Sequence, residues 1–562
     1  MFMYIILITV GILFLILAAA GNASATRSRT GNPEADESGV GDANPAQGRS
    51  IVALKVLFAA LIVGGVLLSA FIAGRGALAG NSPAVTIPSR PNFVVIMTDD
   101  QDMDSLPVMR NLMSYIGGGW VRFTSAFAND AKCCPSRTSF LTGQYSHNHG
   151  VITNGRGHRL ADEHTLPVWL NDVGYHTGLF GKYLIGFPWS LPANYQAPGW
   201  DEFFVNRDSI DGQTGQALKF LDEAPANAPF FLYLAYTAPH HVARPPDRYV
   251  DVPVYIPPRR PNFNPDDVSD KPLWVRRLPL LSDETLAEWD NERANSQREL
   301  LAIDDGVLAI LEKLQAMGKM DDTIFIFVAD QGFSWGSHRW IYKNCPYVEC
   351  SNFPLFIRVP GGENRVESRL VSNVDLAPTI TDLAGAPITG RVADGRSFAA
   401  LLTDPGTPWA EGVLMERHAG DPPSVFYAAQ NNRYMYSEYG NGDVELYDMA
   451  ADPYQMRNVV ADPSYAAARA EMTALLATLM AGGQPPMPTA TPSPTPIPTA
   501  TLPGEPTETP TATPPTSTTT TPTSTVTTPV PTTPTATPTA TATWPPITPT
   551  AFYYLPALLG GR

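Results

Sequence analysis

Residues 92–100 read NFVVIMTDD, an apolar run that ends in Thr98, Asp99 and Asp100. A short, continuous apolar run of this kind is typical of a strand buried on both faces of a sheet. Two further apolar runs end in polar residues in the same way: 323–329 (TIFIFVA) before Asp330 and Gln331, and 230–236 (FFLYLAY) before His240 and His241.

Helix-like segments alternate with these runs. Residues 298–317 have apolar side chains at helical spacing and several charges on the other face. This alternation predicts an α/β fold with a large, mostly parallel sheet flanked by helices, over about 90–404. Short alternating strands then predict a small antiparallel subdomain over 405–482. In parallel sheets, ligand sites lie beyond the carboxyl ends of the strands, where the polar residues above fall.

The composition limits the class of protein. The 562 residues include 38 Lys or Arg and 54 Asp or Glu, a net charge of −16. This balance argues against nucleic acid, which is bound mainly by clustered basic residues. Four cysteines are too few for a disulfide scaffold. Residues 483–550 are dominated by Pro and Thr, so they cannot bury a core, and we expect a disordered stalk there.

The two ends of the chain indicate export. Residues 1–20 carry no charge and could be a transmembrane segment or a signal peptide. A polar loop at 21–50 precedes a second apolar run at 51–73, which carries only Lys55 and resembles a transmembrane helix or signal anchor. Either interpretation places the folded region at 90–482 outside the cytoplasm, anchored to the membrane or at the cell surface. The apolar tail at 551–562 is too short to span a bilayer.

Acidic and amide side chains follow two of the expected strands. Asp99, Asp100, Asp330 and Gln331 offer three carboxylates and one carbonyl oxygen. Hard cations take oxygen ligands, whereas zinc favours His and Cys. We therefore expect a divalent cation, calcium first and magnesium second. A single Asp-Asp pair is usually a solvated turn, but two such sites at strand ends favour a metal site.

Residues 132–143 read KCCPSRTSFLTG and fit the pattern C-x-P-S-R-x-x-x-x-T-G, counted from Cys133. This segment resembles the modification signature of the sulfatase family, in which that cysteine becomes formylglycine. The resemblance extends over about 90–460, in the family's order, through RPNFVVIMTDDQD, GLFGKYLIG, LAYTAPHH, FVADQGFSWGSHRWIYK and ELYDMAADPYQMRNV. The sequences CCPSR and GKYL are most similar to those of the N-acetylglucosamine-6-sulfatase branch of this alkaline-phosphatase-like superfamily.

The resemblance implies a role for each matched residue. The cation would be held by Asp99, Asp100, Asp330 and Gln331, with modified Cys133 close to it. The other implied catalytic residues are Arg137 beside the formylglycine, Lys182 and Lys343 on the sulfate oxygens, His240 near the ester oxygen, and His338 assisting proton transfer. A hydrated aldehyde carries two hydroxyls, so one can attack sulfur and the other can later expel sulfate. A formylglycine-generating maturation system is therefore an implied partner.

Three positions depart from the family's pattern. Leu184 stands where many sulfatases have a histidine, which leaves open the group that deprotonates the hydrate. Gln331 replaces the usual Asn, with the same carbonyl on a longer arm. His241 follows His240, so the two could exchange roles.

These features predict an exported sulfuric ester hydrolase that acts on a sulfated sugar or glycan. Two alternatives remain at the level of sequence. One is a phosphomonoester or phosphodiester hydrolase of the same superfamily, and the other is a non-catalytic, stalked surface binding protein.

Cysteine positions give two more expectations. Cys345 and Cys350 lie just after Lys343, and we expect a disulfide there, with two free buried thiols as the alternative. A helix should begin at about Pro135 or Ser136, which puts Cys133 near its positive end. Cys134 should point elsewhere and pack as a small apolar residue.

Overall fold

The computed structural model describes residues 87–184, 195–205, 209–409, 412–419, 423 and 425–485. The apolar runs at 1–20 and 51–73, the loop between them, the Pro/Thr stretch after 485 and the tail at 551–562 lie outside the described residues. Among the helices of the described part, none has both the length and the apolar character needed to cross a membrane.

An eight-stranded sheet forms the centre of the fold. In spatial order its strands are β11 (Arg365–Glu367), β2 (Trp120–Phe123), β10 (Leu355–Arg358), β7 (Thr323–Ala329), β1 (Asn92–Thr98), β6 (Phe230–Ala235), β4 (His176–Gly181) and β5 (Glu202–Val205). All neighbouring pairs are parallel except the two that β10 makes, with β2 and β7. The predicted class, α/β with a mostly parallel sheet, is confirmed.

The strand β1 lies between β7 and β6, and all seven of its residues are buried. Phe93, Val95 and Met97 pack into the core on one face of the sheet. Val94 and Ile96 pack into the core on the other face. The run NFVVIM is therefore apolar at every position because neither face of this strand meets water.

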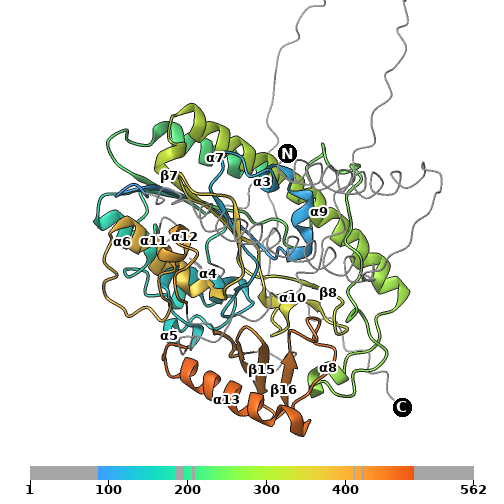
Figure 1. Ribbon diagram of the computed structural model, residues 1–562. Helices are drawn as coiled ribbons and strands as arrows, with labels where there is room; N and C mark the ends of the chain where they lie inside the picture. Colours follow the sequence, from blue (N-terminus) through green and yellow to red (C-terminus); the bar gives the residue numbers. More distant parts are fainter. Residues whose placement is uncertain are drawn as a thin grey trace, which may run out of the picture. The chain divides into compact units, whose positions relative to one another are not determined.

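Helices cover both faces of the sheet (Figure 1). One layer contains α3 (Arg110–Met113), α7 (Ile210–Glu223) and α9 (Asp283–Ala316), and the other contains α4 (Cys133–Thr142), α6 (Leu166–Asp172), α11 (Leu376–Ala384) and α12 (Ala399–Thr403). These layers bury the sheet as an α/β fold requires.

Two helices begin earlier than the sequence predicted. The helix expected over 298–317 begins at Asp283, where the Ser282 side chain accepts a hydrogen bond from the Thr285 amide at 3.3 Å. The first half of this helix is largely polar, so the spacing of apolar residues did not predict it. The helix α4 begins at Cys133, so Pro135 lies in the first turn and the cysteine is itself helical.

A four-stranded antiparallel sheet follows in the C-terminal part. It consists of β13 (Val413–Arg417), β14 (Phe426–Gln430), β15 (Tyr434–Tyr439) and β16 (Val444–Asp448). The helix α13 (Ala466–Met480) packs Met472, Leu475 and Leu476 against it. The remaining short elements are β3 (Ala126–Phe127), α5 (Ser146–His149), α8 (Leu273–Arg276), β8 (Ser334–Trp335), β9 (Ile341–Tyr342), α10 (Val348–Ser351) and β12 (Val371–Ser372).

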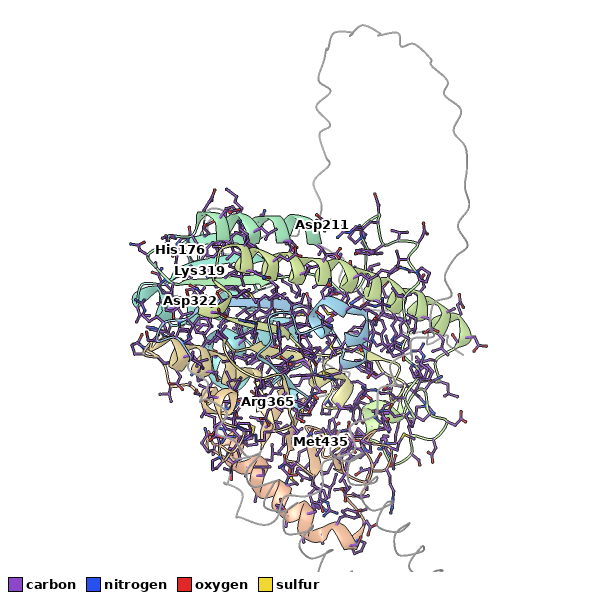
Figure 2. The ribbon with its side chains drawn as sticks, turned by 45° about the horizontal axis from the view of Figure 1, so that its top comes forward. His176, Asp211, Lys319, Asp322, Arg365 and Met435 are labelled. Atoms are coloured by element: carbon purple, nitrogen blue, oxygen red, sulfur yellow. A yellow bond between two sulfur atoms is a disulfide. The ribbon has the colours of Figure 1, made fainter. Side chains whose placement is uncertain are left out.

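The parallel strands all begin at one edge of the sheet. Figure 2 labels His176, the first residue of β4, and Asp322, which directly precedes β7, on the same side of the molecule. The carboxyl ends of these strands therefore meet at the opposite edge, where the polar residues singled out in the sequence gather.

Candidate active site

Three carboxylates converge where β1 and β7 end. The register pairs Thr98 with Ala329, so Asp99, Asp100 and Asp330 leave the sheet side by side. The Asp100 amide donates to Asp330 Oδ1 at 3.0 Å, and the three carboxylates offer oxygens within 4.8 Å of one another. All three are at least 97% buried. Asp100 has φ 66°, a left-handed conformation that turns the chain sharply after the strand.

Gln331 completes this group with an unused oxygen. Its amide nitrogen donates to Asp100 Oδ1, while its Oε1 is buried and has no hydrogen-bond partner among the described residues. A buried carbonyl oxygen without a partner is costly unless a ligand fills the space. The donor set contains oxygens only, which fits calcium or magnesium. These residues therefore fit the cation that the sequence predicts.

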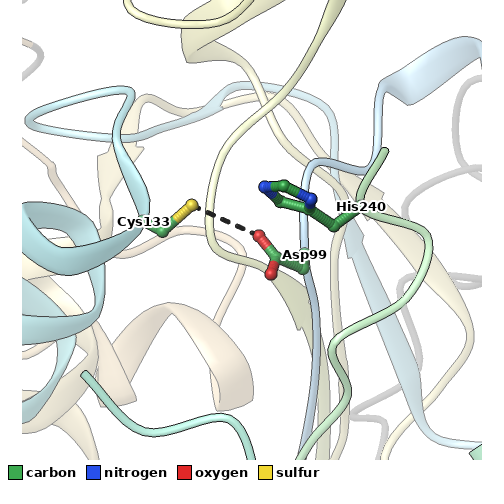
Figure 3. Close-up of side chains that lie close together, drawn as sticks. All are labelled: Asp99, Cys133 and His240. Carbon is green, nitrogen blue, oxygen red and sulfur yellow. Dashed lines mark hydrogen bonds between the residues drawn. The ribbon is translucent and has the colours of Figure 1, made fainter. Parts of the chain in front are cut away.

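Cys133 lies against this group at the start of α4 (Figure 3). Its Sγ is 3.4 Å from Asp99 Oδ1 and 2.9 Å from Lys343 Nζ, and the residue is fully buried. Burial, reinforced by Asp99, raises the pKa of the unmodified thiol to about 11. The thiol is thus a weak nucleophile near neutral pH. Cys134 instead belongs to the apolar core on the same face of the sheet, as predicted.

Three basic side chains surround the carboxylates. Lys182, directly after β4, donates to Asp99 Oδ2, and Lys343 donates to both Asp100 oxygens at 2.6 Å. Arg137 donates from Nε to Asp330 Oδ2 at 2.8 Å. Burial lowers the pKa of Lys343, but the neighbouring negative groups, Asp100 first, together outweigh it and hold the pKa well above its ordinary value. These cations are therefore permanently charged.

Asp99 and Asp330 have opposite pKa shifts. Burial raises the pKa of both. At Asp99 the positive charges, Lys182 first, outweigh burial and hold the pKa well below its ordinary value. At Asp330 the neighbouring Asp99 adds to burial, and the pKa rises to about 6. Such a crowded set of carboxylates favours a bound cation, which would relieve their mutual repulsion.

His240 is the more open member of the group. Its Nε2 lies 3.6 Å from Asp100 Oδ2, and its side chain is 28% exposed, so it faces the entrance rather than the interior. The ring of His241 stacks on it at 4.7 Å. Burial, with the His240 charge, lowers the pKa of His241 to about 4. His240 is accordingly the better placed of the two to exchange a proton.

His338 is placed elsewhere. Its Nε2 is 3.1 Å from Asn262 Nδ2, its ring packs on Tyr347 at 4.1 Å, and no described hydrogen bond or ion pair joins it to the carboxylates or to Cys133. Burial lowers its pKa to about 4. The structure therefore does not place His338 in contact with the side chains that it was expected to assist; its ring packs on Tyr347. Leu184 is buried in the core, so it provides no substitute for the family's histidine.

An aromatic wall beside His240 was not foreseen from the sequence. His241, Trp289 and Tyr342 pack together, with Trp289 and Tyr342 at 5.2 Å and His241 and Tyr342 at 5.4 Å. Trp335 adjoins Trp289 at 6.2 Å, and both are partly exposed. Trp289 belongs to the polar first half of α9, which the apolar pattern missed. The aromatic residues in the sequences FSW and RWIY could have indicated the positions of Trp335 and Tyr342.

The expected disulfide is confirmed: Cys345 and Cys350 are bonded, with their Cα atoms 5.6 Å apart. It closes a short loop directly after Lys343. The indole of Trp340 donates to the Lys343 carbonyl at 2.9 Å, so the backbone of this lysine is held from both sides.

Comparison with known proteins identifies the family to which the chain belongs. The sequence model of the sulfatase family matches residues 91–386, and that of the C-terminal region of N-sulphoglucosamine sulphohydrolase matches residues 336–482. The chain belongs to the sulfatase family and is a sulfatase, an enzyme that hydrolyses sulfate esters.

Relatives of known function are consistent with the branch that the sequence predicted. Human N-acetylglucosamine-6-sulfatase is 29% identical over 66% of this chain and 81% of its own length. The N-acetylglucosamine-6-O-sulfatase of Bacteroides thetaiotaomicron is 27% identical over 69% and 86%. The extracellular sulfatase SULF-1 homolog of Drosophila melanogaster is 27% identical over 58% of this chain and 33% of its own length.

Solved structures share the fold. A protein in complex with its substrate D-glucosamine-2-N,6-O-disulfate has a TM-score of 0.61, 23% identity, and coverage of 70% of this chain and 98% of its own. The phosphonate monoester hydrolase of Agrobacterium radiobacter has a TM-score of 0.57, 22% identity, and coverage of 70% and 96%.

Proposed function

We propose that this sulfatase removes sulfate from a sulfated sugar or glycan, with residue 133 as formylglycine and a divalent cation held by Asp99, Asp100, Asp330 and Gln331. The observation that carries the proposal is the position of Cys133. In the unmodified chain its sulfur touches Asp99 and Lys343, at the edge of the sheet where the carboxylates converge. A hydrated aldehyde at that position would supply the nucleophilic hydroxyl, and the cation would supply Lewis-acid stabilisation of negative charge.

The chain's own cations suit a sulfate group. Lys182 and Lys343 are held next to Cys133 by ion pairs to Asp99 and Asp100. A substrate sulfate near Cys133 would accept hydrogen bonds from these ammonium groups, which remain charged at all working pH values. As the sulfur–oxygen bond breaks, the charge that develops on the sulfuryl oxygens meets donors that are already oriented. Arg137 fixes Asp330 and, through its Nη1, the Lys182 carbonyl at 3.1 Å.

His240 would give the proton to the leaving alcohol. It lies at the open side of the carboxylate group, where the substrate's sugar would enter, and its Nε2 is 3.6 Å from Asp100 Oδ2. The aromatic wall formed by His241, Trp289, Trp335 and Tyr342 borders the same side. Aromatic faces with polar edges are common linings of sites for amphipathic ligands, and a sugar ring is such a ligand.

The test is hydrolysis of defined substrates by the purified chain matured to formylglycine. We expect sulfate release from 6-O-sulfated N-acetylglucosamine, on the basis of the relatives named above. The panel should include sugars sulfated at other positions, sulfated polysaccharides and an aryl sulfate. Sulfate release from the aryl sulfate, with none from any sugar, would refute the assignment of a sugar substrate. It would still show that the enzyme is an active sulfatase.

Phosphorus esters are the second candidate. The shared fold with a phosphonate monoester hydrolase favours testing this reaction. The permanently charged Lys182 and Lys343 can bind either anion, so the fold alone does not separate the two. The same panel should carry phosphate and phosphonate monoesters. A higher kcat/KM on these than on every sulfate ester would reverse the assignment.

We also propose that the catalytic region is exported and held at the membrane or cell surface by the N-terminal apolar runs. The apolar sequences at 1–20 and 51–73 support this, and the extracellular relative is consistent with it. Protease added to intact cells should cleave the region after residue 75. Protection until lysis would contradict export.

A further inference from the structure

A group of metal-ligating side chains lies apart from the carboxylates around Cys133. His147 in α5, Glu416 in β13 and His418 just after β13 have ligand atoms within 4.8 Å of one another. Glu416 Oε2 is 2.7 Å from His147 Nδ1 and 3.0 Å from His418 Nε2. The three residues are brought together only by the fold, because about 270 residues of chain separate the first from the others.

These distances are close to those of a zinc site. Zinc binds His nitrogen and carboxylate oxygen at about 2.0–2.1 Å, so tetrahedral neighbours lie about 3.3 Å apart. The nitrogen–oxygen distances of 2.7 Å and 3.0 Å would need to widen by about 0.6 Å and 0.3 Å to reach this value. Two imidazoles and one carboxylate are ligands suited to zinc and other transition metals, and not to calcium.

The His-Glu-His group is accessible to solvent through its two histidines. The Glu416 side chain is fully buried, whereas the His147 and His418 side chains are 21% and 14% exposed. A water molecule can therefore reach the group from solvent and complete a fourth position. The Glu416 backbone is fixed as well, because its amide donates to the Asn129 carbonyl at 2.6 Å.

A second observation points to an ion here. Asp130 is 99% buried, and neither of its carboxylate oxygens has a hydrogen-bond partner among the described residues. It directly follows Asn129, whose carbonyl accepts the hydrogen bond from the Glu416 amide, and its charged neighbours include Arg417, Lys132, Glu416 and His418. A buried carboxylate without partners is costly. A water molecule bound to a divalent ion would give this carboxylate the hydrogen-bond donor that it lacks.

Without an ion, the group would be a hydrogen-bonded triad. Glu416 would accept hydrogen bonds from His147 Nδ1 at 2.7 Å and from the His147 amide at 3.2 Å, whereas His418 Nε2, although 3.0 Å from Glu416 Oε2, has no hydrogen-bond partner among the described residues. That arrangement satisfies Glu416 but leaves Asp130 with no partner.

We propose that His147, Glu416 and His418 bind one zinc ion, with water as the fourth ligand and Asp130 accepting a hydrogen bond from that water. The ion would connect β13 to the segment that carries the nucleophile. Asp130 lies three residues before Cys133, and His147 lies five residues after α4 ends. The role is structural, and the proposal is independent of the sulfatase substrate.

The experiment measures zinc binding in the full chain. Protein stripped with a chelator and returned to saturating calcium should bind one zinc per chain, measured by titration calorimetry and by elemental analysis after gel filtration. Substitution His147→Gln or His418→Gln should weaken binding about 10-fold or more, as loss of a protein ligand does. Cobalt in place of zinc should give the visible absorption of a four-coordinate site, and His418→Gln should remove it.

The matched control is His176→Gln (Figure 2). His176 is also partly exposed beside two carboxylates, Asp201 at 3.3 Å and Glu202 at 3.6 Å, and this variant should bind zinc as the unchanged chain does. A Cys133→Ser variant should bind zinc normally too, because Asp99, Cys133 and His240 form a separate candidate group. No zinc bound at micromolar concentration, equal binding by the His418 and His176 variants, loss on Cys133→Ser, or iron in place of zinc would each overturn the proposal.

Discussion

Lys343 donates to both carboxylate oxygens of Asp100 at 2.6 Å while its Nζ also lies 2.9 Å from Cys133 Sγ. The two residues come from opposite ends of the catalytic region, 243 positions apart. Their contact ties the loop after β9 to the end of β1, and it holds a permanent positive charge beside the nucleophile's position. The ion pair thus orders the site before any substrate arrives.

The first prediction concerns the two adjacent cysteines. Cys133→Ala should abolish turnover, because only position 133 faces the carboxylates and Lys343. Cys134→Ser should keep much of the activity, since Cys134 packs in the core and the substitution changes little volume. Peptide mass spectrometry of active enzyme should find the aldehyde at 133. An unmodified Cys133 in active enzyme, or an aldehyde at 134, would contradict the assignment.

The second prediction separates two histidines. His240→Ala should lower kcat on a sulfated sugar by about 100-fold or more, the usual contribution of a general acid. The loss should be much smaller on an aryl sulfate, whose leaving group needs no proton.

His338→Ala is the matched comparison. It should leave kcat nearly unchanged and lower the free energy of unfolding by about 2 kcal/mol or more, because it opens a cavity beside Tyr347. Equal losses of kcat in the two variants on both substrates would refute this division of roles.

The third prediction concerns the disulfide. Replacing Cys345 and Cys350 together by Ser should lower the free energy of unfolding by roughly 2 kcal/mol, the chain-entropy value for so short a loop. Activity should fall several-fold under conditions in which the variant is fully folded, because Lys343 lies two residues before the loop. Circular dichroism and steady-state kinetics give the two quantities. Unchanged kcat/KM would mean that the disulfide does not position Lys343.

The fourth prediction concerns the cation. Chelator should inactivate the enzyme, and calcium should restore it better than magnesium, because every proposed ligand atom of the chain is oxygen. Asp330→Asn should weaken calcium binding. Elemental analysis should be carried out on the His418→Gln variant, so that metal at the proposed His147/Glu416/His418 site does not contribute. Stoichiometric zinc in that active variant would show that the choice of calcium is wrong.

The fifth prediction concerns Glu299 in α9. Burial raises the pKa of this carboxyl to about 7, although it accepts a hydrogen bond from the Arg244 amide at 2.7 Å. The folded state thus holds a proton that the unfolded state has lost, so stability falls as pH rises from about 4.5 to about 7.

Glu299→Gln keeps the acceptor and removes the charge. The substitution should raise the free energy of unfolding at pH 8 by up to about 3 kcal/mol, and with it the unfolding temperature. At pH 4 it should change both quantities little. Thermal unfolding at the two pH values measures the difference. A stabilisation of equal size at both would exclude ionisation as its cause.

The sequence predicted the sheet and most of the site because both depend on short-range patterns. NFVVIM and TIFIFVA are apolar throughout, so their ends marked where Asp99 and Asp330 would meet. The long helix α9 was only half foreseen, since the segment before residue 298 stays polar where it does not pack on the sheet. The placement of His338 could not be read from its position near Lys343, because His338 lies in the turn between the antiparallel strands β8 and β9, whereas Lys343 follows β9. The contact of His147 with Glu416 depends on the docking of the C-terminal sheet, which no local pattern encodes.

The position of β1 in the middle of the sheet determines when this strand can pair during synthesis of the chain. Its two neighbours, β6 and β7, are synthesised about 130 and 230 residues later. This apolar strand therefore has no sheet partner until β6 is made, and such distant pairing is slow. The same delay keeps Cys133 accessible, because Asp330 and Lys343 reach it last. In the finished fold the sulfur is fully buried. A maturation enzyme would therefore have to act while the chain is still emerging, before residue 330 closes the site.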